Sequence, residues 1–346
     1  MIIEMKRYTN NFNLIRIIAA TQVLIIHACN HFGYDSFFIN LLRCFPGVPI
    51  FFFTSGYLIG NTYIKNHNKG LKTFFRNRFL RLYPALWICI IISVTIVFLS
   101  GYFNNHTFNI FHFIIWNLGQ MSFFQFYNPE FMREYGVGVL NGSLWTIAIE
   151  VQFYVLTPIL YFLLKKHKPL IIVILLLSII SNLWLRYNYD WTNIVIKLIS
   201  VSFLPWIYMF LLGYLASYYK KQKEFLLSKS NVWLILLLYV LAMNLFGNYE
   251  SNASNSINPI AVLLLCIIIL KFAHTNLRLP EKVQSFLHSY DLSYGIYIYH
   301  MPIINLFLYL NIYALSINIF LTLLLTFLFA YLSWIFIERR ALQLKK

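Results

Sequence analysis

Long apolar stretches, separated by short polar segments, recur along the whole of this chain. About 20 consecutive apolar residues match the hydrocarbon thickness of a bilayer when they form a helix. A bilayer core offers backbone groups no water to bond with, so such stretches span it as helices. The sequence therefore predicts an all-α, polytopic transmembrane helical bundle of about ten spans. The predicted spans cover residues 11–33, 44–64, 83–100, 143–164, 169–186, 196–218, 231–247, 257–274, 293–312 and 314–337.

The composition excludes an ordinary soluble fold. Of the 346 residues, 60% are hydrophobic and only 11% are charged, whereas soluble proteins have roughly 45–50% and about 25%. No internal repeat or soluble domain is visible, so we expect one membrane domain over residues 1–346 with no appended soluble domain. The four Cys residues show neither a CxxC motif nor metal spacing. We therefore expect free thiols and no metal site.

The positive charge indicates membrane orientation. A net charge of +16 is common in nucleic-acid-binding proteins, but here the cations lie between apolar runs and not on one domain. We therefore expect no nucleic-acid partner. If the apolar segment 108–127 does not span, 22 of the 27 Lys and Arg residues fall in cytoplasmic segments and four in outer ones, as the positive-inside rule requires. This predicts cytoplasmic termini and an outer segment 101–142, in which 108–127 lies in the interface or re-enters the membrane.

Four ionisable residues inside the predicted spans are functional candidates, because such residues are costly in a bilayer. Arg16 and His27 are eleven residues apart, so they share one helix face about 16 Å apart. Counting residues places Glu150 about 10 Å below the outer surface, at the level of His27. This predicts a His27–Glu150 acid–base pair, with a structural pair as the alternative. The same counting puts His300 at the inner level near Arg16, as a donor-site or structural residue.

Arg78 and Arg81 are three residues apart, which puts them on one helical face at the end of a basic loop. Guanidinium groups bind phosphates through paired hydrogen bonds. The pair is therefore a candidate phosphate site, and a topology signal or lipid headgroup contact is the alternative. Gly56 and Gly60 form a GxxxG pattern, which predicts close packing of two helices.

These residues resemble the motifs of the acyltransferase-3 family of integral-membrane acyltransferases. Each motif alone is weak, but five in order across residues 11–340 are specific. Many members carry an extracytoplasmic hydrolase-like domain that this sequence lacks, so we expect the chain to act alone, as a homo-oligomer, or with separate envelope-biosynthesis partners. The motifs are the Arg-x10-His of Arg16 and His27, the segments 52–58 and 78–84, Ser143 to Trp145 with Glu150 and residues 153–154, residues 293–297 with His300, and residues 337–338.

The resemblance implies an O-acetyltransferase of the bacterial inner (cytoplasmic) membrane. It would move an acetyl or short acyl group from cytoplasmic acyl-CoA, by default acetyl-CoA, to a sugar hydroxyl of a polysaccharide or lipid-linked glycan such as O-antigen or exopolysaccharide. His27 would be the general base and Glu150 would orient it; an acyl-histidine intermediate is the alternative. Donor binding would fall to Arg16, Arg78, Arg81 and His300, with Ser143, Trp145, Ser55 and Tyr57 as supporting wall residues.

Two other classes of membrane protein compete with this interpretation. A transporter or flippase of lipid-linked sugars would move substrate without acyl transfer, and it predicts broken helices in corresponding halves of the chain. The sequence shows no such symmetry. A polysaccharide polymerase or ligase would concentrate arginines in large outer loops, whereas the outer segments hold only four of the 27 cations.

Overall fold

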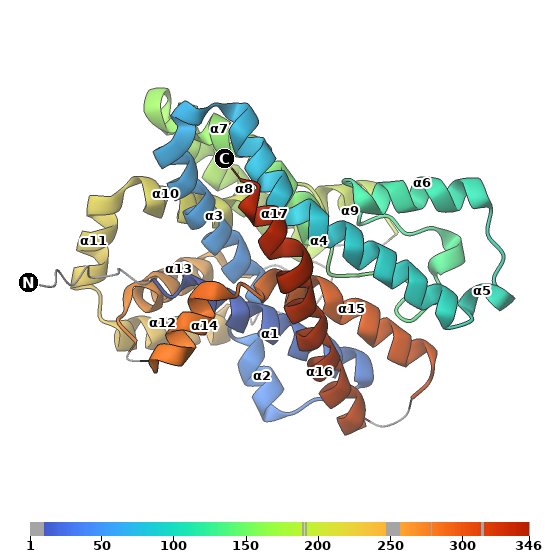
Figure 1. Cartoon of the computed structure of the whole chain (residues 1–346). Coiled ribbons are helices and arrows are strands. Elements are labelled where there is room, and N and C mark those ends of the chain that lie inside the picture. The colour runs from blue at the N-terminus through green and yellow to red at the C-terminus, as the bar shows by residue number, and fades with distance from the viewer. Residues whose placement is uncertain are drawn as a thin grey trace, which may run out of the picture.

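The computed structural model describes residues 10–188, 190, 192–246, 257–277, 279–312 and 315–345, and every element assigned in them is helical (Figure 1). The predicted span ends at residues 247 and 314 lie outside these ranges. Single turns of 3-10 helix cover His67–Lys69 and Glu130–Met132, and a π turn covers Trp334–Glu338. The α-helices are α1 (Phe12–Phe32), α2 (Phe37–Arg43), α3 (Gly47–Asn66), α4 (Leu71–Leu99), α5 (Tyr102–Asn105), α6 (Ile110–Met121), α7 (Trp145–Lys166), α8 (Lys168–Asn188), α9 (Ile194–Ser200), α10 (Ile207–Tyr218), α11 (Lys220–Lys229), α12 (Val232–Leu245), α13 (Pro259–His274), α14 (Glu281–Ser289), α15 (Ser293–Tyr309), α16 (Leu315–Ser333) and α17 (Arg339–Gln343).

The helices support the predicted membrane architecture, but fewer of them are long enough to span than the apolar runs suggested. Within the described residues, six segments are long and apolar enough to cross a bilayer, against about ten predicted. Helices α11 and α12 would add a seventh only as a pair bent by 92°, and α10 and α13 are apolar but shorter. The six segments are Phe12–Phe32, Phe37–Lys69, Leu71–Leu99, Trp145–Lys166, Lys168–Asn188 and Ser316–Gln343.

The predicted span 196–218 is broken into two helices, α9 and α10. The backbone N–H of Phe203 in the break donates to Gln152 Oε1 at 2.8 Å. The indole of Trp206 donates to the Ser200 carbonyl, also at 2.8 Å. Because side chains satisfy polar groups that a continuous helix would satisfy itself, the break is tolerated. A count of apolar residues does not detect such a break.

Helix α6 runs back along α4 instead of lying in a simple outer loop. One end of α6 packs near the end of α4, where the Phe98 and Phe113 rings are 5.8 Å apart. Its other end lies near the start of the apolar part of α4, where the Trp87 indole donates to the Met121 carbonyl at 2.8 Å. At 12 residues, or about 18 Å, α6 is too short to span. The segment 108–127 therefore folds back along α4, and its re-entry into the membrane stays a prediction.

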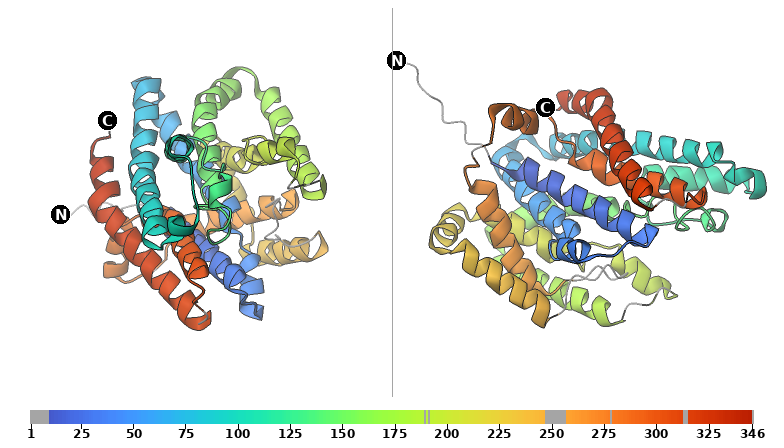
Figure 2. Two further views of the ribbon diagram at one scale, coloured as in Figure 1. Left: turned by 90° about the vertical axis from the view of Figure 1, so that its right-hand side faces the viewer. Right: turned by 90° about the horizontal axis from the view of Figure 1, so that it is seen from below.

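The core of the bundle joins the two ends of the sequence. Helix α1 packs against α15, α16 and α3, as two further views show (Figure 2). Helix α3 also packs closely against α10, and a Cβ atom on Gly56 would lie 1.9 Å from the Phe210 carbonyl oxygen. A Cβ on Gly60 would lie 2.6 Å from Ser217 Oγ. The close packing predicted from the GxxxG pattern is confirmed.

Candidate active site

Four charged side chains form a partly buried ion-pair network where α1, α4, the start of α15 and the π turn meet. The carboxylate of Asp291 accepts hydrogen bonds from Arg16 at 2.7 Å and from Arg81 at 2.5 Å. Arg81 also pairs with Glu338 at 3.2 Å, and the Glu338 side chain is only 1% exposed. Two cations and two anions therefore balance each other, and they tie distant parts of the sequence together at one level of the bundle.

Local structure explains why the two acids reach this network. Asp291 lies just before α15, where an acidic group interacts favourably with the helix N-terminus, and its second oxygen accepts from Ser293 Oγ at 2.6 Å. Glu338 is the last residue of the π turn. Such turns are rare and are frequent at functional sites. Neither acid was predicted to be a site residue, although residues 337–338 belong to the last of the family motifs.

Arg78 differs from Arg81 although both lie on the same face of α4. Its guanidinium faces the rings of Phe74 at 5.8 Å and Tyr154 at 5.9 Å. Its Nε atom is buried without a hydrogen-bond partner. No carboxylate in the described ranges pairs with it. The predicted phosphate pair is therefore split into an arginine that is paired with carboxylates, Arg81, and a half-buried arginine without an ion pair in the described residues, Arg78.

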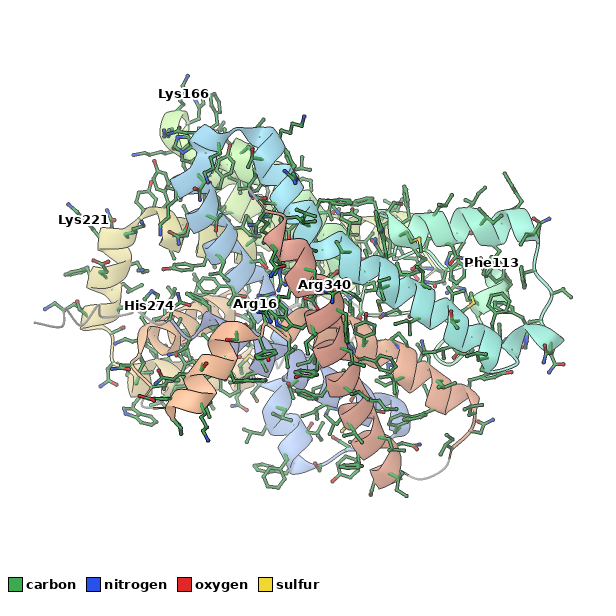
Figure 3. The ribbon with its side chains drawn as sticks, viewed as in Figure 1. Arg16, Phe113, Lys166, Lys221, His274 and Arg340 are labelled. Atoms are coloured by element: carbon green, nitrogen blue, oxygen red, sulfur yellow. The ribbon has the colours of Figure 1, made fainter. Side chains whose placement is uncertain are left out.

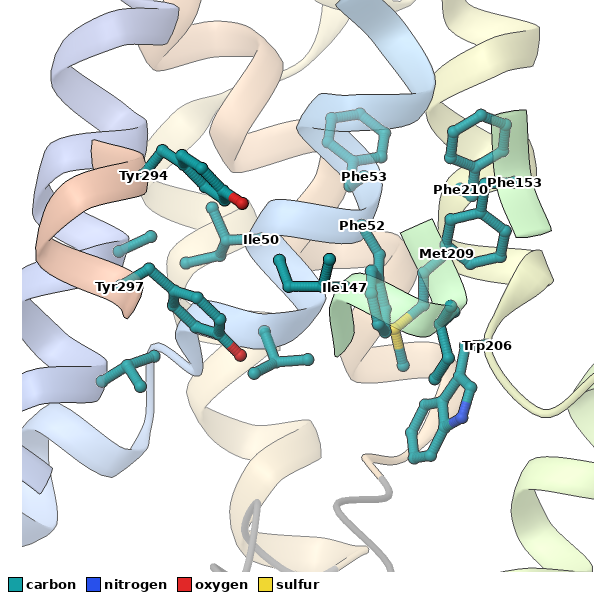
Figure 4. Packing of buried hydrophobic residues seen from close by; sticks show 14 of the residues in the cluster. Ile50, Phe52, Phe53, Ile147, Phe153, Trp206, Met209, Phe210, Tyr294 and Tyr297 are labelled. Atoms are coloured by element: carbon teal, nitrogen blue, oxygen red, sulfur yellow. The ribbon is translucent and has the colours of Figure 1, made fainter. Parts of the chain in front are cut away.

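A small cavity lies beside the ion-pair network. Its volume is about 40 Å³, which is room for roughly three water molecules. Figure 3 shows Arg16 in the middle of the bundle, and Figure 4 shows Tyr294 and Tyr297 projecting from α15 toward Ile50 and Ile147. The cavity is lined by Arg16, Val48, Phe51, Phe52, Ser55, Thr146, Ile147, Glu150, Ser293, Tyr294 and Tyr297.

Two histidines lie one turn of α15 beyond this cavity. His27 Nδ1 and His300 Nε2 are 2.9 Å apart, and His300 is completely buried. The Tyr297 ring, which lines the cavity, is 6.0 Å from the His300 ring. Arg16 and His27 both face α15, through Asp291 and His300 respectively. Their shared helix face, predicted from an eleven-residue spacing, is confirmed.

The structure corrects the predicted partner of His27. Glu150 does not bond to His27 anywhere in the part of the chain described; it lines the cavity with Arg16 and accepts a hydrogen bond from Tyr154 at 2.6 Å. The reason is that α7 begins deep in the bundle. Asn141, just before α7, donates to the Ile298 carbonyl at 2.7 Å, so residues counted from the outer surface are placed too high.

The predicted level of His300 is wrong for the same kind of reason. Helix α15 follows Asp291, which already lies beside Arg16, four residues inside the start of α1. Nine residues separate Asp291 from His300, and at 1.5 Å each they carry His300 about 14 Å along the bundle. This is close to the 16 Å that separates Arg16 from His27 on α1. His300 therefore lies beside His27 and not beside Arg16.

The four predicted wall residues are not all at the cavity. Ser55 lines it. Ser143 is buried next to it and donates to the Tyr297 carbonyl at 3.2 Å, and Trp145 packs against the Trp206 ring at 5.3 Å. Tyr57 lies elsewhere, stacked on Phe12 with ring centroids 4.7 Å apart and accepting a hydrogen bond from Lys223. Tyr57 therefore contributes to packing and not to the cavity wall.

Comparisons with known proteins identify the class of protein that carries this site. A family model described as an acyltransferase domain, that of the acyltransferase-3 family, matches residues 9–338. Nodulation protein 10 of Rhizobium leguminosarum bv. viciae is 27% identical, over 86% of this chain and 83% of that protein. The O-acetyl transferase of Shigella phage Sf6 is 26% identical over 96% of both chains.

A third relative is longer than this chain. The peptidoglycan O-acetyltransferase OatA of Listeria monocytogenes is 26% identical over 87% of this chain, and the match spans about half (50%) of that protein. No solved structure matches. The chain belongs to the acyltransferase-3 family and is a helical membrane O-acetyltransferase.

Proposed function

We propose that the protein transfers an acetyl group from cytoplasmic acetyl-CoA to a sugar hydroxyl of a bacterial cell-envelope polysaccharide, in the inner membrane. The observation that carries the proposal is the order of groups along one bundle. A half-buried arginine with no ion pair in the described residues comes first, then a cavity, and then a histidine pair. A donor with a phosphate end and a reactive thioester end needs groups in this order.

The arginine end is the donor entrance. The positive-inside rule assigns the basic loop before Arg78 to the cytoplasm, where acyl-CoA is found. Arg78 supplies a guanidinium with a free Nε–H for a phosphate oxygen. Arg16 lines the cavity and directs the pantetheine arm past Glu150. The cavity of about 40 Å³ has to widen around this arm, so donor binding separates α3, α7 and α15.

His27 is the general base for the acceptor. It lies about 16 Å beyond Arg16 along α1, toward the predicted outer side. The acceptor hydroxyl gives its proton to His27 while its oxygen attacks the thioester carbonyl carbon. The carbon–sulfur bond then breaks, and the protonated imidazole returns the proton to the thiolate of CoA. The products are the sugar ester and free CoA.

The network around Asp291 has a supporting role. It neutralises Arg81 and fixes Arg16 at the mouth of the cavity. Glu150 contributes a negative charge near Arg78 and Tyr154, and it is held by the Tyr154 hydroxyl. We therefore assign Glu150 to the donor passage and not to the orientation of His27.

Mass spectrometry of envelope glycans tests the proposal. Deleting the gene should remove an acetyl-sized mass from one polysaccharide, and the wild-type gene should restore it. His27→Ala should fail to restore it although the variant reaches the membrane in normal amounts. His31→Ala, which changes another histidine on the same helix, is the matched control and should restore it. Acetylation by His27→Ala at the wild-type level would refute the assigned base, and an unchanged glycan profile after deletion would refute the acceptor class.

A further inference from the structure

A chain of hydrogen bonds fixes where the protons lie on the two histidines. His300 Nδ1 is 3.2 Å from the carbonyl oxygen of Ile296, one turn earlier on α15. A carbonyl oxygen only accepts, so Nδ1 of His300 carries a proton. In a neutral ring, Nε2 is then an acceptor, and it faces His27 Nδ1 at 2.9 Å. His27 therefore donates from Nδ1, and its own Nε2 carries the lone pair.

His300 is neutral because nothing near it compensates a positive charge. It is fully buried, and none of the carboxylates that the structure describes bonds to either ring. The other titratable groups close to the pair are His31 on α1 and Tyr297 on α15. A buried imidazolium without a counter-ion would be costly in a membrane. Two neutral rings avoid this cost.

From this geometry we infer that His300 is a positioning residue that holds His27 as the Nδ1-protonated tautomer, so that Nε2 is the nitrogen that accepts the proton of the acceptor hydroxyl. The inference rests on the proposed function of His27. Within the described residues, His27 Nε2 has no hydrogen-bond partner, so it is available for this role. Without His300, the His27 ring can rotate or adopt the other tautomer. Its basic nitrogen then no longer faces the acceptor hydroxyl.

The inference also explains why a histidine takes the place that a carboxylate holds in many acid–base pairs. When the hydroxyl proton reaches Nε2, the Nδ1–H of His27 stays bonded to His300 Nε2. The charge is then shared with a polarisable neutral ring for the short time before the thiolate takes the proton. A carboxylate at this depth would add a permanent buried charge in the resting enzyme.

Two amide substitutions of different length test the inference. In His300→Gln the amide oxygen reaches the position of Nε2 and accepts from His27. In His300→Asn the amide is one methylene shorter, so it still reaches the Ile296 carbonyl but not His27. The assay follows incorporation of radiolabelled acetyl-CoA into the endogenous polysaccharide of isolated membranes. His300→Gln should keep the maximal rate within about tenfold, whereas His300→Asn should lose about 100-fold or more. Both should keep the wild-type KM for acetyl-CoA.

A pH profile separates positioning from a merely structural role. In His300→Glu a carboxylate faces His27 and stabilises its protonated form. The acidic limb of the maximal rate should then move to higher pH by about one unit or more, while His300→Gln should not move it. If His300→Glu does not fold, the maximal rates of His300→Gln and His300→Asn alone test the inference. Equal rates in the Gln and Asn variants, at matched membrane levels and melting temperatures, would overturn the inference.

The outcome is distinguishable from failure of the proposed function. If wild-type membranes transfer no label, or if His27→Ala is fully active, the proposed function itself is wrong. If His27→Ala is inactive while His300→Asn has the wild-type rate and pH profile, only the role of His300 is wrong.

Discussion

Arg78 and Arg81 lie three residues apart on one helix, but replacing each by Ala should change a different property, donor binding or stability. Arg81 is held by Asp291 and Glu338, whereas Arg78 has a buried Nε atom without a partner. Removing Arg81 should therefore affect mainly stability. Removing Arg78 should affect mainly the binding of the acyl donor.

The expected loss of stability in Arg81→Ala comes from the acids that it leaves behind. Asp291 keeps Arg16, but Glu338 keeps only the hydroxyl of Ser333 at 3.2 Å. Breaking a buried ion pair by removing one partner costs about 3–5 kcal/mol. In a chain of this size, that corresponds to a fall in melting temperature of roughly 5 °C or more.

The expected effect of Arg78→Ala is on KM. Arg78 forms no ion pair within the described residues, and the Glu150 carboxylate near it keeps its hydrogen bond from Tyr154. The melting temperature should therefore fall less than it does in Arg81→Ala. Losing one charge-assisted hydrogen bond to a phosphate costs about 1.5–3 kcal/mol. The KM for acetyl-CoA should therefore rise about 10- to 100-fold.

Both variants can be compared with wild type by two measurements. Thermal unfolding of detergent-purified protein gives the melting temperature, and label transfer in membranes gives KM. Arg76→Ala, two residues before Arg78 on α4 and exposed, is the matched control and should change neither quantity. The reasoning is refuted if Arg78→Ala destabilises the protein as much as Arg81→Ala does, or if its KM for acetyl-CoA is unchanged.

The remaining predictions concern a terminal lysine, a loop histidine and a helix crossing. Burial and the nearby guanidiniums, including Arg78, lower the pKa of Lys345 to about 7. If its ammonium group assists Arg78 in the proposed phosphate site, the KM for acetyl-CoA should rise as the pH passes 7, and the KM of Lys345→Arg should lack this rise. The Glu134 carboxylate raises the pKa of His106, so the pair stabilises the loop fully below about pH 6.5 and loses this contribution as the pH rises through the higher folded-state value. The melting-temperature difference between wild type and Glu134→Gln should accordingly vanish by about pH 8.5. Gly56→Ala should lower the melting temperature markedly, because its Cβ would lie 1.9 Å from a carbonyl oxygen of α10.

Properties set within one helix could be predicted from the sequence. Arg16 and His27 share a face because rise and rotation per residue are constant in an α-helix, and both contact the α15 region. The close packing at Gly56 also depends only on residue size. The roles of Arg78 and Arg81 could not be separated in this way. Their difference depends on Glu338, 257 residues away from Arg81.

Predictions of which residues on two different helices lie at the same level failed when they depended on where a helix begins. The prediction assumed that α7 and α15 start at a membrane surface, as an apolar run suggests. Instead, side-chain amides and acids set both starting levels: Asn141 bonds to the Ile298 carbonyl, and Asp291 bonds to Arg16. Such residues cost too much to bury unless they are paired, so a polar residue just before an apolar run is compatible with a helix that starts inside the bundle.

The cost of burying charge also accounts for where the charged residues of the site lie. Charged groups gather around Asp291, whose carboxylate pairs with Arg16 and Arg81. The proposed base His27 and its partner His300 lie beyond the cavity, one turn of α15 further on. A charge beside His27 would hold the imidazole in one protonation state, whereas its reaction requires both states in turn. Pairing His27 with a neutral histidine leaves it free to change state. In the proposed mechanism, the charges that bind the donor therefore lie away from His27, on the other side of the cavity.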